Sequence, residues 1–393
     1  MKRSRSFTLC VLAALLCVLI FLRTDGGPGR ELAPVSAPAP DVPAEEIAEI
    51  SPVDVLIAAM TKEEKVWQMF VLRPEQVTGQ LSSSDGALWA EGLQARPAGG
   101  LVFDGSHMAS AAELKEMLAA AESGSDSEIA PFLCVDEEGG AVARVAYNLG
   151  VTTDFRPMFT YREGGTETAY ENARTIAGDI AGFGFNVDLA PVADVWTNPE
   201  NTVIGTRAYS DDPAEAAKLV AAAVKGFHDG GVMTVLKHFP GHGDTAEDSH
   251  LGAAYSDKTA AELRECEFLP FVAGIAAGAD MVMMGHITMN RIDPDVPASL
   301  SRRVVTELLR GELGFRDGVV ITDAMEMSAL GTFDPGAAAV AAIEAGCDLI
   351  LAPADPDAAA AAVLERIPAE RLDESLRRIL TLKLECGLLD MAE

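Results

Sequence analysis

Eight short apolar runs recur along the chain, separated by helix-like, alanine-rich segments. The runs occupy residues 68–72, 100–104, 132–136, 185–191, 233–238, 280–286, 318–323 and 347–353. Segments between them, such as 211–231 and 334–347, begin with acidic residues and end near glycine, which is typical of helix starts and stops. Nearly continuous apolar strands that alternate with helices indicate a parallel sheet covered by helices. About eight such units predict a single (β/α)8 barrel of the α/β class.

A doubly wound open sheet is the competing architecture. None of the apolar runs is followed by a GxGxxG or GxxxxGK[ST] sequence. The usual phosphate-binding motifs of nucleotide-binding sheets are therefore absent from the sequence.

The N-terminal part of the chain has a different pattern. The basic start "MKRSRS" precedes an uncharged apolar run at 7–22, and a stretch rich in Pro, Ala and Gly follows. This order predicts a signal sequence or membrane anchor at 1–23, a spacer at 24–45 and a catalytic domain at 46–393. Either reading places the domain outside the cytoplasm, membrane-anchored or secreted.

Composition narrows the classes of partner. Sixty acidic residues against thirty basic ones give a formal charge of −30, which argues against nucleic-acid binding. The 49% of hydrophobic residues suffices for a large core, and a monomer is expected. The cysteines beyond the N-terminal segment are scattered without CxxC spacing, and Cys134 and Cys347 are predicted to be buried free thiols.

Polar residues stand where four of the predicted strands end. The runs close on Asp136, on Lys237 and His238, on His286 and on Asp323. Because active sites of (β/α)8 barrels lie at the carboxyl ends of the strands, we expect these side chains to meet there. Asp323 directly follows "GVVIT", so its carboxylate is a candidate nucleophile. The alternative role for Asp323 is the N-cap of a helix starting at "AMEM".

A hydrophilic loop, "KHFPGHGDTAEDSH", follows the fifth strand at 237–250 and holds three of the six histidines. Within it, Asp248 lies two residues before His250, a spacing that lets the carboxylate orient the imidazole and raise its pKa. Such a histidine can donate a proton to a leaving oxygen and later accept one from water. Two alternatives are a metal site, in which His238, His242 and Asp244 would join this pair, and a plain surface loop.

These segments resemble glycoside hydrolase family 3, in its β-N-acetylglucosaminidase branch. The resemblance rests on the loop above, on "ITDAMEM", and on "VDEEGGAVARV", "NVDLAPVADV" and "IGTRAYSDDP", which follow the family's order. It implies a (β/α)8 barrel with Asp323 as nucleophile, His250 as acid/base and Asp248 as its partner. It also implies that sugar hydroxyls and the acetamido group are held by Asp136, Arg144, Arg207, Lys237 and His238. No metal or other cofactor is implied. The sequence has "DEEGG" where the family more usually has "DQEGG".

The sequence thus predicts a retaining β-N-acetylhexosaminidase that removes terminal β-linked N-acetylglucosamine (GlcNAc) from peptidoglycan fragments or other glycans. Within the family, a β-glucosidase or a GlcNAc phosphorylase is the alternative. From other classes, the alternatives are a metal-dependent hydrolase and a non-catalytic wall-binding protein.

Overall fold

The computed structural model describes residues 51–125, 128–246, 249 and 252–389. Each of the eight predicted runs contributes a strand to one sheet, in the order β11-β9-β7-β6-β3-β2-β1-β12, with every pair parallel. The strands are β1 (Phe70–Leu72), β2 (Gly100–Phe103), β3 (Phe132–Val135), β6 (Val187–Asp188), β7 (Met233–Phe239), β9 (Met281–Met284), β11 (Val319–Thr322) and β12 (Ile350–Leu351).

The sheet closes on itself between its two end strands. Ile321 of β11 forms a parallel bridge with Leu349, just before β12. The Thr322 amide donates to the Leu349 carbonyl at 3.0 Å, and the Leu349 amide donates to the Val320 carbonyl at 3.0 Å. The strands therefore form a barrel, which confirms the predicted (β/α)8 fold.

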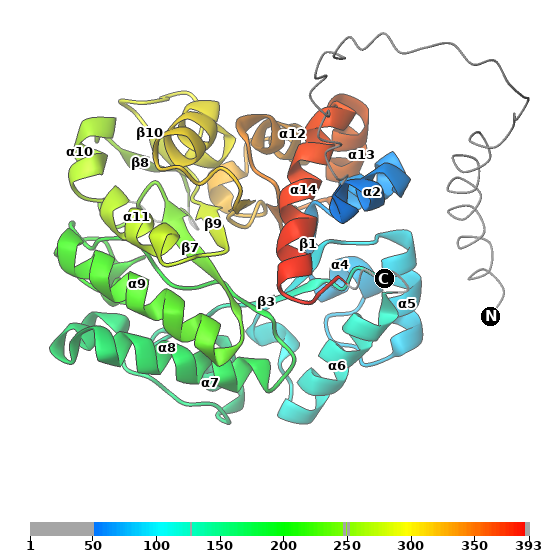
Figure 1. The fold of residues 1–393 in the computed structure, drawn as a ribbon, viewed down its shortest axis with the longest axis horizontal. Coiled ribbons are helices and arrows are strands. Elements are labelled where there is room, and N and C mark those ends of the chain that lie inside the picture. Colours follow the sequence, from blue (N-terminus) through cyan, green and yellow to red (C-terminus); the bar gives the residue numbers. More distant parts are fainter. Residues whose placement is uncertain (1–50, 126–127, 247–248, 250–251, 390–393) are drawn as a thin grey trace, which may run out of the picture. The chain divides into compact units, whose positions relative to one another are not determined.

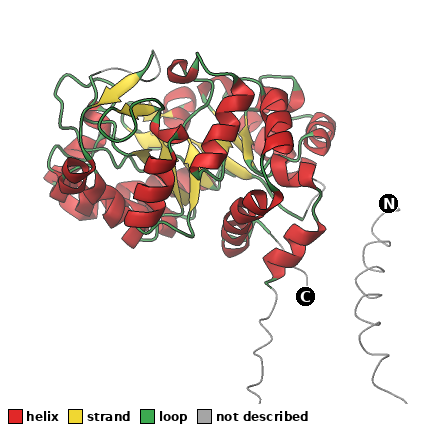
Figure 2. Ribbon diagram, turned by 90° about the horizontal axis from the view of Figure 1, so that it is seen from above, coloured by secondary structure: helices red, strands yellow, loops and turns green. Residues whose placement is uncertain are grey.

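Helices cover the outside of the barrel, and the strands lie inside them (Figures 1 and 2). The α-helices are α2 (Pro52–Ala59), α3 (Lys62–Trp67), α4 (Pro74–Thr78), α5 (Gly86–Ala95), α6 (Ala111–Gly124), α7 (Arg144–Leu149), α8 (Gly165–Ala181), α9 (Pro213–Gly230), α10 (Ala260–Glu265), α11 (Phe268–Ala276), α12 (Pro335–Ala345), α13 (Pro356–Arg366) and α14 (Ala369–Glu385). Short 3₁₀ helices are η2 (Gly105–His107), η3 (Met158–Glu163), η4 (Gly205–Arg207), η5 (Ala298–Leu300) and η7 (Ser328–Leu330), and η6 (Arg303–Glu312) is a π-helix.

The helix boundaries follow the predicted signals. The side chain of Asp212 caps α9, Pro213 occupies its first turn, and Gly231 ends it with a φ of 97°. Asp334 and Asp355 cap α12 and α13 in the same way, each before a proline. An acceptor side chain at the N-cap and a residue free to adopt positive φ after the last turn satisfy the backbone groups that a helix end leaves unpaired.

Two small sheets extend the carboxyl-terminal ends of the strands. After β3 the chain forms an antiparallel pair, β4 (Glu137–Gly139) and β5 (Val142–Ala143). After β7 and β9 it forms a parallel pair, β8 (Ala254–Ser256) and β10 (Ile287–Met289). These additions thicken the face of the barrel on which the polar strand ends lie.

The structure confirms the prediction for two cysteines of the core. Cys134 and Cys347 are buried free thiols. Burial raises the pKa of Cys347 to about 12, so this thiol stays protonated at neutral pH.

The predicted anchor at 1–23 and spacer at 24–45 lie outside the described residues, and α2 begins at Pro52. Within the part of the chain that the structure describes, no helix is long and apolar enough to span a membrane.

Lys383 of α14 is fully buried at the opposite end of the barrel from the carboxyl ends of the strands. Its Nζ donates to Gln68 Oε1 at 3.1 Å and lies 4.9 Å from the centre of the Phe132 ring. Burial lowers the pKa of Lys383 to about 7, because no carboxylate among the described residues compensates for the lost hydration.

We expect Lys383→Met to change how stability depends on pH. The unfolded chain binds the lysine proton up to a pH near 10.5, whereas the folded chain loses it near 7. The wild type should therefore gain stability as pH rises from 7 to 10.5, and the variant should lack this gain. Urea unfolding should be measured at pH 6, 8 and 10. At pH 6 the free energy of unfolding of the variant should exceed that of wild type by a few kcal/mol, since one pKa unit equals about 1.4 kcal/mol. This advantage should disappear by pH 10.

Lys115→Met is the matched control, since the Lys115 ammonium also lies over a ring, that of Phe183, but on an exposed helix face. Its stability relative to wild type should not vary with pH over this range. A parallel pH profile for Lys383→Met and wild type would show that Lys383 is charged in the folded protein.

Candidate active site

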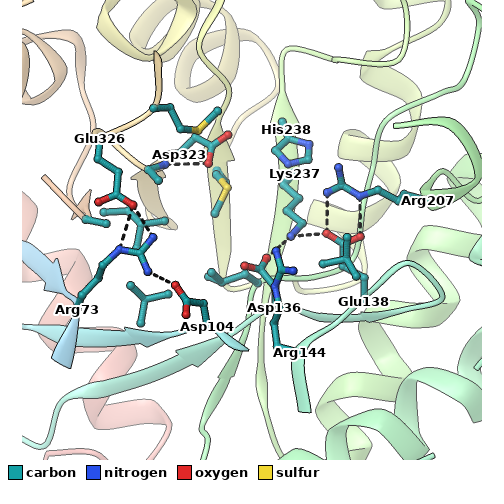
Figure 3. Close-up of a pocket in the computed structure, with 18 residues that line it drawn as sticks. Arg73, Asp104, Asp136, Glu138, Arg144, Arg207, Lys237, His238, Asp323 and Glu326 are labelled. Carbon is teal, nitrogen blue, oxygen red and sulfur yellow. Dashed lines mark hydrogen bonds and ion pairs between the residues drawn. The ribbon is translucent and has the colours of Figure 1, made fainter. Parts of the chain in front are cut away.

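A pocket of about 300 Å³ opens at the carboxyl ends of the barrel strands. Two groups of charged side chains line it, with Asp323 between them (Figure 3). The lining residues are Arg73, Val102, Asp104, Asp136, Glu138, Val142, Arg144, Leu189, Arg207, Lys237, His238, Met283, Asp323, Ala324, Glu326, Met327, Leu351 and Ala352. The pocket thus brings together Asp323 and all five residues predicted to hold the substrate.

Asp323 stands directly after β11, where the parallel ladder with β9 ends. Its backbone amide donates to the Met284 carbonyl at 2.9 Å, and its Oδ1 accepts from the amide of Ala324 at 2.8 Å. The alternative role of Asp323, as the N-cap of a helix that starts at "AMEM", is wrong, because no helix begins there. The chain turns at 324–327 and forms only the 3₁₀ turn η7.

Lys237 forms the centre of the charged group that lies on one side of Asp323. Its Nζ lies 2.5 Å from Asp136 Oδ1 and 2.6 Å from Glu138 Oε1, and its side chain is only 2% exposed. Burial alone would lower the pKa of Lys237, but the two carboxylates outweigh it and raise this pKa. The ammonium is therefore charged at neutral pH, and the two ion pairs fix its direction.

Arg207 completes this group through a bidentate ion pair with Glu138. The Nε and Nη2 atoms of Arg207 lie 2.9 and 2.7 Å from the two carboxylate oxygens, and Nη1 donates to the Val203 carbonyl at 2.9 Å. Burial would raise the pKa of Glu138, yet the charges of Arg207 and Lys237 hold it at about 2. We refer to Asp136, Glu138, Arg207 and Lys237 as the lysine cluster.

His238 is oriented by a buried carboxylate below the pocket. Its Nδ1 lies 2.8 Å from Asp194 Oδ2, and the His238 amide donates to the same oxygen at 3.2 Å. The other oxygen of Asp194 accepts from the amide of His242 at 2.6 Å. Burial would raise the pKa of Asp194, but His238 lowers it, so the carboxylate is charged and Nδ1 of His238 is the donor.

Arg144, the first residue of α7, lines the pocket, and its buried Nε has no hydrogen-bond partner among the residues that the structure describes. Glu137 fixes the start of this helix, because its carboxylate accepts from the amides of Val145 and Ala146 at 2.7 and 2.9 Å. Burial raises the pKa of Glu137 to about 7. A buried N–H that lacks a partner in a pocket suits an oxygen of a ligand.

The loop after β7 is irregular, as its Pro and Gly residues predict. Asp248 and His250, the predicted acid/base pair, lie outside the described residues. Between them, Ser249 is buried, with its Oγ 2.9 Å from Nε2 of His242 and its carbonyl accepting from the amide of Ala329 at 3.3 Å. Ser249 therefore holds this part of the loop against the segment that follows β11.

The alternative of a metal site places its ligands in the same loop. The imidazole of His242 lies between Thr245 Oγ1 at 2.7 Å and Ser249 Oγ at 2.9 Å, and Asp244 lies 3.3 Å from the ammonium of Lys258. Among the residues that the structure describes, no group of three His, Cys, Asp or Glu side chains could hold a metal ion.

One strand-end residue has a different place from the one predicted. His286 does not line the pocket but is buried, with Nδ1 2.7 Å from Ser299 Oγ and Nε2 3.1 Å from the Ala324 carbonyl. Because β9 is followed at once by β10, the His286 ring turns toward η5 rather than into the pocket. It supports the backbone next to Asp323.

The sequence analysis did not predict the charged group on the other side of Asp323. Arg73 follows β1 and lies between Asp104, which follows β2, and Glu326, which follows β11. We refer to Arg73, Asp104 and Glu326 as the arginine cluster. Glu138 of the lysine cluster was also missed. The run "GLVFD" ends in Asp104, so the strand-end argument could have found this residue.

Comparison with known proteins agrees with this geometry. The model of the glycosyl hydrolase family 3 N-terminal domain matches residues 61–382. A β-hexosaminidase of Stenotrophomonas maltophilia (strain K279a) is 40% identical over 225 residues, which are 56% of this chain and 66% of that protein. A β-hexosaminidase of Xylella fastidiosa (strain 9a5c) is 37% identical over 281 residues, which are 70% of this chain and 81% of that protein.

Solved structures give the same result. A glycoside hydrolase family 3 β-N-acetylglucosaminidase from Paenibacillus sp. str. FPU-7 superposes with a TM-score of 0.78 at 36% identity, covering 85% of this chain and 64% of that one. A β-N-acetylhexosaminidase from Beutenbergia cavernae DSM 12333 superposes with a TM-score of 0.71 at 31% identity, covering 83% of this chain and 99% of that one. The barrel, the pocket and these similarities lead to one conclusion: the chain belongs to family 3 of the glycoside hydrolases.

Proposed function

We propose that this protein is a retaining β-N-acetylhexosaminidase that removes terminal β-linked GlcNAc from peptidoglycan fragments or other glycans. One observation carries the proposal. The Asp323 carboxylate lies at the end of β11 in the same pocket as the lysine cluster and His238 (Figure 3). Relatives named as β-hexosaminidases support the choice of sugar.

The first chemical step forms a bond between Asp323 and the sugar. The carboxylate attacks the anomeric carbon while the bond from this carbon to the leaving oxygen breaks. His250, held by Asp248, gives its proton to that oxygen, so the aglycone leaves as a neutral alcohol. The product of this step is a glycosyl ester of Asp323.

The second step releases the sugar. Water attacks the anomeric carbon, His250 takes one of the water protons, and the ester bond to Asp323 breaks. Two displacements on opposite faces restore the β-configuration. His250 ends protonated, ready for the next cycle.

The lysine cluster and His238 would hold the sugar during both steps. Ammonium, guanidinium and carboxylate groups form strong hydrogen bonds with hydroxyl groups, and the fixed geometry of the cluster supplies orientation. Since the buried Nε–H of Arg144 has no partner within the described part of the chain, we assign it to an oxygen of the bound sugar.

The predicted N-terminal segment leads to a proposal about location. A chain with an apolar run at 7–22 behind a basic start is exported, either tethered or secreted, and would act on glycans outside the cytoplasm.

Hydrolysis of 4-nitrophenyl β-GlcNAc, followed by NMR of the released sugar, tests the proposal. The first product should be the β-anomer, turnover should exceed that of the 4-nitrophenyl β-glucoside, and added chelator should have no effect. A first product with the α-configuration would rule out the glycosyl ester. Loss of activity with chelator would favour the metal-dependent hydrolase, and no turnover at all would favour the wall-binding protein.

A further inference from the structure

The two charged clusters divide the pocket into a side for the sugar and a side for the leaving group. The lysine cluster, with Arg144 and His238, is the side assigned to the GlcNAc ring. Asp323 lies between this side and the arginine cluster (Figure 3). A substituent on the anomeric carbon above Asp323 must therefore point away from the lysine cluster, toward the arginine cluster.

The loop after β7 agrees with this direction. Ser249, the described residue between Asp248 and His250, contacts Ala329, three residues beyond Glu326. A proton donor carried by this loop would reach the leaving oxygen from the side on which the segment after β11 lies, and Glu326 of the arginine cluster belongs to that segment.

The arginine cluster carries one more negative charge than positive. Arg73 donates from Nε to Glu326 Oε1 at 3.0 Å and from Nη2 to the same oxygen at 2.5 Å, while Nη1 pairs with Asp104 Oδ2. The arginine side chain is 20% exposed, whereas Asp104 and Glu326 are 35% and 36% exposed. A ligand on this side thus meets carboxylate oxygens, and the cation is already paired twice.

Hydrogen bonds behind the cluster keep it in this arrangement. The Arg73 amide donates to Gln76 Oε1 at 2.9 Å, and Nε2 of Gln76 donates to the Pro353 carbonyl at 2.6 Å. Asp104 caps η2 by accepting from the amide of Ser106 at 2.8 Å, and its own amide donates to Nδ1 of His107 at 2.9 Å. The arginine cluster therefore has this arrangement before a ligand binds.

We propose that the arginine cluster is the aglycone subsite and that it selects neutral or cationic aglycones against anionic ones. The inference rests on the proposed function, since it assigns the leaving-group side of that site. Sugar hydroxyls and amines can donate to the exposed oxygens of Asp104 and Glu326. A carboxylate has no proton to donate there, and a carboxylate or a phosphate is repelled by the like charge of Asp104 and Glu326.

This subsite should distinguish substrates whose aglycone carries a free carboxylate from substrates whose aglycone does not. In a disaccharide of GlcNAc and muramic acid, the lactyl group stands on carbon 3, next to the glycosidic oxygen on carbon 4, so its free carboxylate must enter the pocket. An amide-linked peptide on that lactyl group removes this charge, and a chitin-type aglycone never has it. Inorganic phosphate would approach the glycosyl ester from the same side, so water is the favoured acceptor.

The test compares kcat/KM for GlcNAc-β1,4-muramic acid with that for its methyl ester, which has nearly the same shape without the charge. Wild type should prefer the ester by about tenfold at low ionic strength, and salt should reduce the ratio. Glu326→Gln keeps the side-chain shape and leaves Arg73 balanced by Asp104 alone, so the ratio should fall toward one. Asp104→Asn should act in the same direction.

Glu312→Gln is the matched control, because Glu312 also pairs with an arginine, Arg264, and is 35% exposed, but it lies in η6 and does not line the pocket. Its ester preference should equal that of wild type. Equal kcat/KM for acid and ester in wild type, or a ratio that neither pocket variant changes, would overturn the inference. If the enzyme still cleaves 4-nitrophenyl β-GlcNAc, the proposed function survives that result, whereas failure to cleave any of these substrates overturns both.

Discussion

Replacing Asp323 with alanine should abolish turnover of 4-nitrophenyl β-GlcNAc. The carboxylate stands at the end of β11 in a pocket whose other carboxylates are paired with Arg73, Arg207 or Lys237. Each of these carboxylates is held in place by its ion pair, so none of them can take over the attack on the anomeric carbon. We expect kcat/KM to fall by at least about 10⁴-fold, as in enzymes that lose their nucleophile.

The control for this variant is Asp334→Ala. Asp334 resembles Asp323 in that its carboxylate accepts a backbone N–H, from Ala337 at 2.9 Å, but it caps α12 and does not line the pocket. Loss of this cap should cost about 1 kcal/mol of stability and leave turnover intact. If Asp323→Ala were folded and retained a tenth of the wild-type activity, Asp323 would not be the nucleophile.

The barrel could be predicted because each strand is buried on both faces. A strand in a parallel sheet under helices is apolar at nearly every position, and this makes it visible as a short run in the sequence. The strand lengths were less certain. The run at 185–191 gives only the two-residue strand β6, since the Asn186 side chain takes up part of the ladder by accepting from the Leu133 amide at 2.7 Å.

The pocket was predicted only in part. The sequence indicates which residues stand at the strand ends, but it does not indicate the direction in which each side chain points. Asp323, directly after β11, and Lys237, near the end of β7, both line the pocket, whereas His286 turns aside and contacts the backbone at Ala324. Which of these occurs depends on the next segment of chain, and that segment is fixed by tertiary contacts. Ion pairs between distant segments, such as Arg73 with Glu326, leave no pattern in one sequence.

Glu138 is the residue of the lysine cluster that the sequence argument should have found. Side chains alternate along an extended chain, so in "DEEGG" Asp136 and Glu138 face one side and Glu137 the other. The structure has this arrangement, with Asp136 and Glu138 on Lys237 and Glu137 capping α7. Glu138 is thus the shared anion that holds both Lys237 and Arg207 in place.

Glu138→Gln should lower both stability and activity. The amide keeps the size of the side chain but removes the carboxylate that pairs with both the buried Lys237 and the 13% exposed Arg207. Breaking a buried ion pair in this way costs about 3 kcal/mol, which urea unfolding would measure. Because both cations should shift within the pocket, kcat/KM for 4-nitrophenyl β-GlcNAc should fall by about 10²-fold under conditions where the variant is fully folded.

Asp348→Asn separates the two effects. Asp348 is also a buried carboxylate between cations, 2.5 Å from Arg310 and 3.0 Å from Arg378, but it precedes β12 at the far end of the barrel and does not line the pocket. Its loss should reduce stability by a similar amount and leave kcat/KM unchanged in the folded protein. If Glu138→Gln behaved in the same way, with full activity once folded, the lysine cluster would serve only stability. A loss confined to Glu138→Gln would instead mean that this glutamate, without being a reacting group, sets the positions from which Lys237 and Arg207 meet the sugar.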